Sequence, residues 1–343
     1  MTLADWDATL RIGRRARLLG VLADRLLDRV DCRAALPAPV PGHLQAACNY
    51  AAYRMQQMRM ELRALDAALP REITVVLLKG AAYVVQGLPA ARGRIPSDVD
   101  LMVRRDELDR AEAALHAAGW RSGARDAYDE RYYREWSHEL PPLRYPGHPL
   151  EVDLHHTIAP VTSRTRADDA TLLAGLQAVP ASRFFVLAPA DQIVHAAIHL
   201  FQDSELTGHL RDLVDIDALV RHHLRDEAGW EALFAHAERH RAARLLWYAL
   251  RYCRAWLGTP VPARIALQAP PRLACRGMDW LVAHCCLPQL PGEPPALSTR
   301  VAMVAARARY HWLRMPVSML ALHLAHKGWR RLRPRRAAAG GAA

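Results

Sequence analysis

Two aspartates spaced two residues apart inside an apolar run constrain this chain more than any other feature. Asp98 and Asp100 stand in the run SDVDLMV over residues 97–103. Successive side chains of a β-strand point to opposite faces, so the two carboxylates share one face and the apolar side chains occupy the other. Neighbouring carboxylates repel each other unless a cation lies between them, and a divalent ion with oxygen ligands usually takes that place. The run therefore predicts a strand that binds Mg²⁺, with a solvated edge strand as the alternative.

A second run, LEVDLH, alternates apolar and polar residues without interruption. Its polar face carries Glu151, Asp153 and His155. If the two strands are neighbours, their carboxylates converge, which is what phosphoryl transfer with two metal ions requires. The spacing thus points to nucleotidyl transfer with two Mg²⁺ ions. For Glu151 and His155 two interpretations stay open: they contribute to the site, or they only flank the ligand.

A third element precedes the aspartate pair. Residues 73–78 are apolar and rich in β-branched side chains, which predicts a strand, and Lys79-Gly80 leads from it into a predicted helix. This geometry favours phosphate binding, because glycine allows the backbone to approach closely and the free amides of a helix N-terminus face the anion. Lys79 adds a positive charge. A Lys-Gly pair by itself usually marks only a turn; its position upstream of Arg94 and the aspartates favours a nucleotide site.

These motifs together resemble a known family. Leu78-Lys79-Gly80, Arg94 before Asp98-x-Asp100, and Asp153-Leu154-His155 are similar to the uncharacterised nucleotidyltransferase family NTP_transf_5, of the DNA polymerase β-like superfamily. The resemblance implies an α+β fold, in which a small mixed β-sheet core with helices is flanked by N-terminal and C-terminal helical regions. It also implies the roles of site residues: Asp98, Asp100 and Asp153 as metal ligands, and Lys79, Gly80, Arg94 and Ser97 as nucleotide or phosphate contacts. In the wider superfamily, the glycine that corresponds to Gly80 is usually followed by Ser or Gly. In this chain it is followed by Ala81, which is the form expected in the narrower family.

The resemblance further implies an NTP as donor and a hydroxyl group as acceptor. The preferred acceptor is a small molecule, a sugar or a peptide. Nucleic acid is not favoured, because the chain shows no aromatic platform of the RNA-recognition type. The residues expected on the acceptor side are His155, Glu151, His199 and Asp215. A catalytically silent nucleotide- or partner-binding module of the same fold is the competing interpretation, which the joint presence of the three aspartates disfavours.

Composition agrees with a folded enzyme. The 343 residues are 51% hydrophobic, enough for two domains and a substantial core. No apolar stretch reaches the roughly 18 residues that a membrane span needs. The first seven residues lack the basic-then-apolar order of a signal peptide, so a cytoplasmic location is expected. The six cysteines are scattered without a C-x-x-C pair, which indicates buried reduced thiols rather than a metal site.

The net charge of +11 suggests an anionic partner. The densest basic run spans residues 327–336 and follows an apolar segment that begins at Tyr310. The preferred interpretation is a solvated, disordered tail. Peripheral contact of this tail with an anionic membrane, as in a membrane-surface-associated biosynthetic accessory protein, is an alternative, and so is contact with nucleic acid.

Four parts are expected along the chain: a helical region at 1–68, the nucleotidyltransferase core at 69–160, a C-terminal helical domain at 161–325 and the basic tail at 326–343. Residues 128–136 are aromatic and charged, which suggests a strand or a lid. His195 and His199 have the spacing of zinc ligands, but lining a cleft or completing core hydrogen bonds is the preferred interpretation. The periodicity predicts helices at 11–30, 43–69, 106–118 with Gly119 as its end, 191–201, 210–223 and 230–257.

Overall fold

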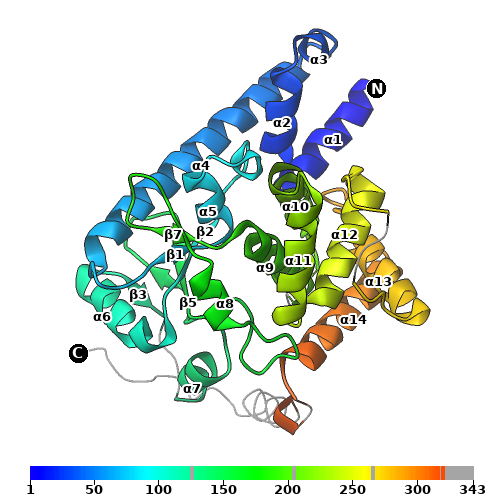
Figure 1. Cartoon of the computed structure of the whole chain (residues 1–343). Helices are drawn as coiled ribbons and strands as arrows, with labels where there is room; N and C mark the ends of the chain where they lie inside the picture. Colours follow the sequence, from blue (N-terminus) through cyan, green and yellow to red (C-terminus); the bar gives the residue numbers. More distant parts are fainter. Residues whose placement is uncertain (124–126, 203–205, 264–266, 317, 321–343) are drawn as a thin grey trace, which may run out of the picture.

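The computed structural model describes all residues except 124–126, 203–205, 264–266, 317 and 321–343. Its centre is a seven-stranded mixed sheet in the order β3-β4-β5-β2-β1-β7-β6. The long helix α4 runs along one side of this sheet, and the helices α9 to α14 lie on the other (Figure 1). The predicted α+β fold, a small mixed sheet flanked by N-terminal and C-terminal helices, is confirmed. The basic tail at 326–343 lies outside the described residues.

Two strands at the middle of the sheet position the aspartates. β2 and β5 are parallel, and Asp100 lies opposite Asp153 in the register. Val99 and Val152, on the other face of the pair, are completely buried. The strands are β1 (Val76–Leu77), β2 (Asp98–Met102), β3 (Arg121–Ser122), β4 (Leu143–Arg144), β5 (Glu151–His155), β6 (Gln177–Ala178) and β7 (Phe185–Val186).

The sheet extends beyond the part of the sequence that predicts it. β7 pairs in parallel with β1, and β6 pairs with β7, although helices alone were expected after residue 160. Each of these strands has only two residues, too few for a readable alternation. Residues 127–135 form a helix, α7, so the expectation of a strand there is wrong.

Two predicted helices are each divided in two. Arg17 has φ +56° and separates α1 from α2, and Arg241 has φ +50° and separates α11 from α12. Neither position carries glycine or proline, so the sequence gives no sign of the break. The helices are α1 (Leu3–Arg15), α2 (Leu19–Leu27), α3 (Val30–Ala34), α4 (Val40–Ala68), α5 (Lys79–Val85), α6 (Leu108–Ala118), α7 (Ala127–Glu135), α8 (Asp169–Ala174), α9 (Pro189–Gln202), α10 (Leu210–His223), α11 (Glu227–Arg239), α12 (Ala243–Leu257), α13 (Arg272–Cys285) and α14 (Leu297–Arg314), with 3-10 turns at Pro89–Ala91 and Arg105–Glu107.

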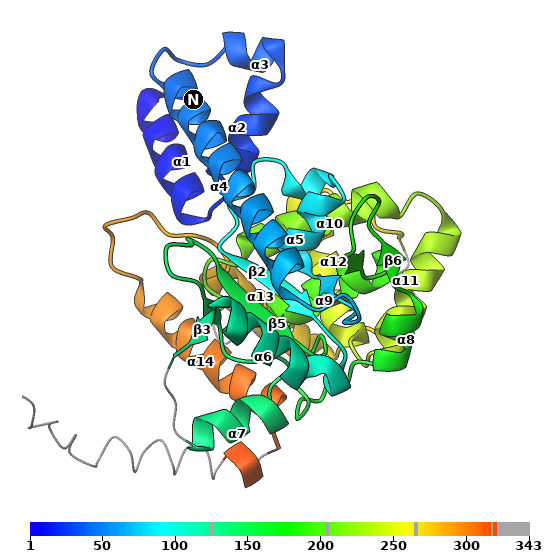
Figure 2. The ribbon, with the colours of Figure 1, turned by 90° about the vertical axis from the view of Figure 1, so that its left-hand side faces the viewer.

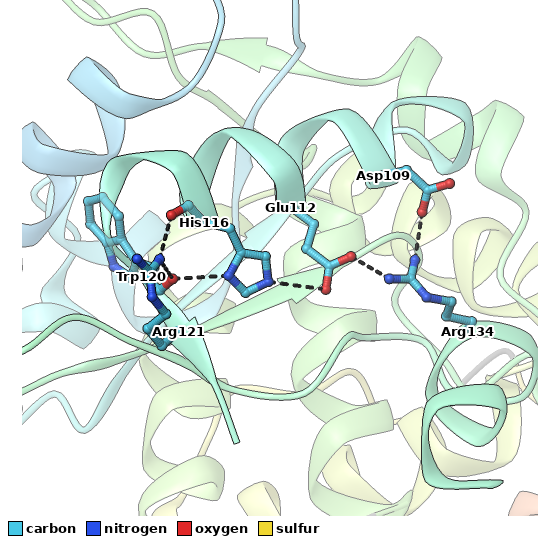
Figure 3. A network of polar contacts seen from close by, with 6 residues as sticks. All are labelled: Asp109, Glu112, His116, Trp120, Arg121 and Arg134. Carbon is cyan, nitrogen blue, oxygen red and sulfur yellow. Dashed lines mark hydrogen bonds and ion pairs between the residues drawn. The ribbon is translucent and has the colours of Figure 1, made fainter. Parts of the chain in front are cut away.

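α6 ends as its sequence predicts, since Gly119 caps it with φ +113°, a left-handed conformation that glycine adopts without strain. A polar network then fixes α7 against α6 (Figure 3). Arg134 on α7 donates to Asp109 at 2.6 Å and to Glu112 at 2.5 Å, and His116 lies 3.7 Å from the other oxygen of Glu112. The network continues to Trp120, whose carbonyl oxygen lies 3.0 Å from His116 and 2.9 Å from Arg121.

The segment that leaves α7 reaches β5. The amide of Leu140 donates to the carbonyl of Leu154 at 2.8 Å, and the amide of His156 donates to the carbonyl of His138 at 2.9 Å. These bonds place Glu139 opposite His155, at the end of β5. The contacts of this segment with β5 therefore determine which side chains stand beside the aspartates.

The N-terminal helices are attached to the loop that precedes β2. Gly20, in α2, packs so closely on Gly93 that a Cβ on either glycine would overlap the backbone of the other. Gly93 also has φ +65°, which non-glycine residues rarely adopt. Among the described residues, no helix combines the length and the apolarity that crossing a membrane requires.

We expect Gly93→Ala to lower the free energy of unfolding by about 2–4 kcal/mol, because the methyl group meets both a strained φ and the backbone of Gly20. Urea unfolding measures the change. Gly42→Ala is the control, since nothing lies within 4 Å of its added Cβ and α4 tolerates alanine. Equal stability of the two variants would contradict the close packing of these glycines.

Candidate active site

A polar pocket of about 280 Å³ opens where β2 and β5 meet the C-terminal helices. Three carboxylates line it, those of Asp98, Glu139 and Asp153. Asp98 and Asp153 come from neighbouring strands of the sheet, and Glu139 comes from the segment after α7. The remaining lining residues are Lys79, His138, Ile158, Pro160, His195, Ile198, His199, Gln202, Tyr310 and Arg314.

Asp100 lies against Lys79 rather than at the open surface of the pocket. The Lys79 ammonium is 2.8 Å from an Asp100 oxygen, and the two side chains are 15% and 5% exposed. Burial disfavours the charge of Lys79, but Asp100 and then Asp98 outweigh it and raise its pKa. Burial likewise opposes the ionised form of Asp100, yet Lys79 and then His155 hold its pKa well below the usual range. The pair is therefore fully ionised at neutral pH.

Lys79 reaches this position through an unusual backbone. It is the first residue of α5 and has φ +41°, a conformation that few residues other than glycine adopt. Such conformations cost free energy and persist where the surrounding structure requires them. Here the carbonyl of Asp100 accepts a hydrogen bond of 3.0 Å from the amide of Leu78, which joins the start of α5 to β2.

Asp153 is the carboxyl group whose ionisation the cluster opposes. Burial, and then the neighbouring charges of Asp100 and Glu139, raise its pKa to about 8. The carboxylates that meet here therefore oppose one another's ionisation. Carboxylate oxygens are the ligands that Mg²⁺ prefers, so the donor set fits a divalent cation.

His155 and Glu139 complete the cluster. The Nε2 atom of His155 is 3.1 Å from Asp100 and 3.4 Å from Glu139, and the ring is 1% exposed. Burial opposes protonation of His155, but the hydrogen bond to Asp100 and the charge of Glu139 raise its pKa. Glu139 was not among the predicted site residues. It lies in no alternating run or motif, and only the tertiary contacts of the segment after α7 bring it to the site.

Arg94 forms a separate contact on the far side of Gly80. It makes an ion pair with Asp215 on α10 and lies over the Tyr83 ring, 5.6 Å from its centre. A Cβ on Gly80 would come within 3.1 Å of Arg94 Nε, so this glycine makes room for the guanidinium. Burial, and then the charge of Arg211, lower the pKa of Arg94 to about 10. Arg94 and Asp215, predicted for the nucleotide and the acceptor sides, are thus bound to each other.

The remaining predicted residues lie in different places. Glu151 makes an ion pair with Arg144 on β4, the neighbouring strand toward the sheet edge, and is 39% exposed. Ser97 is half-buried and directly precedes β2. His199 lines the pocket, and its Nδ1 atom is 3.5 Å from Asp212.

The other pocket histidines are uncharged. Burial, followed by the positive charge of neighbouring groups, holds the pKa of His138 and of His195 well below the usual range. His195 and His199 both line the pocket. Neutral imidazoles in this position offer hydrogen bonds to a polar substrate without adding charge.

We expect Lys79→Met to lower the free energy of unfolding by about 3 kcal/mol in the presence of a chelator, because it leaves the buried Asp100 without its ion-pair partner. Added Mg²⁺ should restore part of the loss, which thermal unfolding with and without the ion measures. Arg71→Met is the control, since its pair with Asp66 is exposed. A Mg²⁺ effect of the same size in both variants would contradict a cation site at the carboxylates.

Asp212 makes a contribution to the stability of the fold that depends on pH. Burial raises its pKa, but hydrogen bonds from His199 and His209 outweigh this and hold the pKa well below the usual range. A depressed carboxyl pKa stabilises the fold above the unfolded-state pKa of about 3.9, and the contribution is lost as pH falls through the folded-state value. In urea unfolding at pH 7, the free energy of unfolding of the wild type should exceed that of Asp212→Asn by about 2 kcal/mol. That gap should narrow below about pH 4, and a gap independent of pH would contradict this assignment.

Comparison with known proteins gives one family match. Residues 2–258 match the family described as uncharacterised nucleotidyltransferase, NTP_transf_5. No curated protein and no solved structure matches the chain. The matched segment contains β2, β5 and the start of α5, the three elements whose residues suggested this family from the sequence. The chain therefore belongs to the NTP_transf_5 family of uncharacterised nucleotidyltransferases.

Proposed function

We propose that this protein transfers a nucleoside monophosphate from an NTP to an acceptor hydroxyl. The observation that carries the proposal is the parallel register of β2 and β5, which sets Asp100 beside Asp153 and next to Lys79. Membership of a nucleotidyltransferase family supports the same chemistry. The donor is a nucleoside triphosphate, and the acceptor is a small molecule that bears a hydroxyl group.

Asp98, Asp100 and Asp153 would hold two Mg²⁺ ions. Bound there, the ions supply charge neutralisation of the triphosphate and activation of the acceptor oxygen. Glu139 is the nearest additional oxygen ligand, since it lines the same pocket as Asp98 and Asp153. Burial, and then the charges of Asp100 and Glu139, raise the pKa of Asp153 to about 8, which supports this placement because a bound cation would favour the ionised form.

In the reaction, the acceptor oxygen forms a bond to the α-phosphorus while the bond from the α-phosphorus to the bridging oxygen of the β-phosphate breaks. Pyrophosphate leaves, and the hydroxyl proton passes to Asp153, with His155 as the second candidate. Lys79 offsets negative charge at the pocket wall. Gly80, Arg94 and Ser97 flank the nucleotide from the start of α5 and from the loop before β2.

The pocket favours a small polar acceptor. His138, His195, His199 and Gln202 bring hydrogen-bonding groups to its wall, and two of these histidines are held neutral. Such a lining suits the hydroxyl groups of a sugar, a small molecule or a peptide. Of the predicted acceptor set, His199 lines the pocket, and it comes from α9 rather than from the strands that carry the aspartates.

Transfer is tested with each α-labelled NTP, Mg²⁺ and a fractionated small-molecule extract. Asp98→Ala/Asp100→Ala and Asp153→Asn should each reduce labelling at least about a thousandfold, equivalent to about 4 kcal/mol of lost transition-state stabilisation. Asp106→Ala is the matched control, because this aspartate is 67% exposed and pairs only with Arg104 among the described residues. Labelling that persists in both site variants would overturn the mechanism, and NTP binding without transfer to any fraction would favour a silent binding module.

A further inference from the structure

The last turn of α14 brings a second cation to the pocket. Arg314 lines it together with Asp98, Asp153 and Lys79. Its guanidinium donates to the Ser137 hydroxyl at 3.2 Å and to the Tyr310 hydroxyl. All these hydrogen-bonding partners are neutral. Within the part of the chain that the structure describes, no carboxylate lies within ion-pair distance of Arg314.

Aromatic rings enclose the same guanidinium. It lies 5.3 Å from the centre of the Tyr310 ring and 5.4 Å from that of Tyr132, on α7. Its Nε atom is buried and donates no hydrogen bond. Arg314 is half-buried and has no carboxylate partner among the described residues, so an anion that binds in the pocket meets an uncompensated positive charge.

The two cationic side chains that the sequence predicted as nucleotide contacts already form ion pairs with carboxylates. Lys79 is 2.8 Å from Asp100, and Arg94 is paired with Asp215. Both pairs are buried, and breaking either would leave a carboxylate uncompensated. Arg314 alone of these three cations has no such partner, and it is also in the pocket.

The structure holds Arg314 in place by its backbone. The Thr162 hydroxyl donates to the carbonyl of Arg314 at 2.8 Å, and the amide of Arg164 donates to the carbonyl of Leu313 at 3.2 Å. The Arg164 guanidinium also lies 4.7 Å from the centre of the Trp312 ring. These contacts join the end of α14 to the loop that follows β5, and Figure 2 shows α14 running past the sheet toward α7. The guanidinium is thus presented by a fixed helix end.

We infer that Arg314 binds the β- and γ-phosphates of the NTP and the pyrophosphate that leaves. The inference rests on the proposed function and adds a residue to it from outside the family-matched segment, which ends at residue 258. A guanidinium suits this task because its planar set of N–H donors bonds two phosphate oxygens at once. Negative charge grows on the bridging oxygen as the pyrophosphate separates, so a cation at that end stabilises the transition state.

Binding measurements test the inference without requiring the acceptor. Isothermal calorimetry with Mg²⁺ and ATP, GTP, CTP or UTP identifies the NTP that the wild type binds, and inorganic tripolyphosphate serves as a probe without a base. Arg314→Gln should weaken both the NTP and tripolyphosphate by about tenfold to a hundredfold, the loss expected for hydrogen bonds to a charged group. The affinity for the matching nucleoside monophosphate should stay unchanged. Arg314→Lys should recover part of the loss, because an ammonium keeps the charge but not the paired donors.

Arg300→Gln is the matched control, since this arginine is exposed near the other end of α14 and should bind as the wild type does. Thermal unfolding checks that each variant folds. If Arg314→Gln does not fold, the affinity of Arg314→Lys for the triphosphates tests the inference in its place. A wild type that binds no NTP overturns the proposed function and this inference together. A wild type that binds, with equal affinity in Arg314→Gln, overturns this inference alone, as does an equal loss of triphosphate and monophosphate binding.

Discussion

Repulsion among carboxylates at the end of one strand pair is the constraint on which the rest of this structure depends. β2 and β5 bring Asp98, Asp100 and Asp153 to one place, and Glu139 adds a further negative charge. Each carboxylate removed from water needs a hydrogen bond or an opposite charge. Lys79 pairs with Asp100, whereas burial, and then the charges of Asp100 and Glu139, raise the pKa of Asp153 to about 8. The fold thus holds together carboxylates whose ionisation is opposed by burial and by one another.

Parts of the chain far apart in sequence support this cluster. The Arg94–Asp215 pair ties the loop before β2 to α10, and the Gly20–Gly93 contact ties the same loop to the N-terminal helices. The Arg134 network fixes α7 and, through it, the segment that carries Glu139. A shift in any of these would move a carboxylate relative to the others, and the electrostatic energy of such a cluster depends steeply on distance.

Groups of both charges line the pocket. Asp98 and Asp153 come from the sheet and Glu139 comes from the segment after α7, whereas Arg314 comes from α14. This combination suits a triphosphate with bound metal ions, because the metal ions need oxygen ligands near the reacting phosphorus, whereas the leaving phosphates need donors. The family-matched segment contains these carboxylates, while α14, which lies beyond residue 258, supplies the arginine.

Much of the site was readable from the sequence. Alternation of apolar and polar residues around Asp98, Asp100 and Asp153 predicted two strands with acidic faces, and this local rule holds because a strand buried on one face must repeat every second residue. Gly119 marked a helix end for an equally local reason, its left-handed φ. By contrast, the two-residue strands β6 and β7 exist only because they pair with β1.

The pairing of Arg94 with Asp215, the arrival of Glu139 beside His155 and the position of Arg314 join residues that are tens to hundreds apart in the chain. No periodicity records such contacts, because a side chain's charge partner depends on how the helices and the sheet pack. The sequence by itself determined which strands carry acidic faces. Only the tertiary structure decided which charges remain unpaired, since pairing is a property of distances between elements and not of order along the chain.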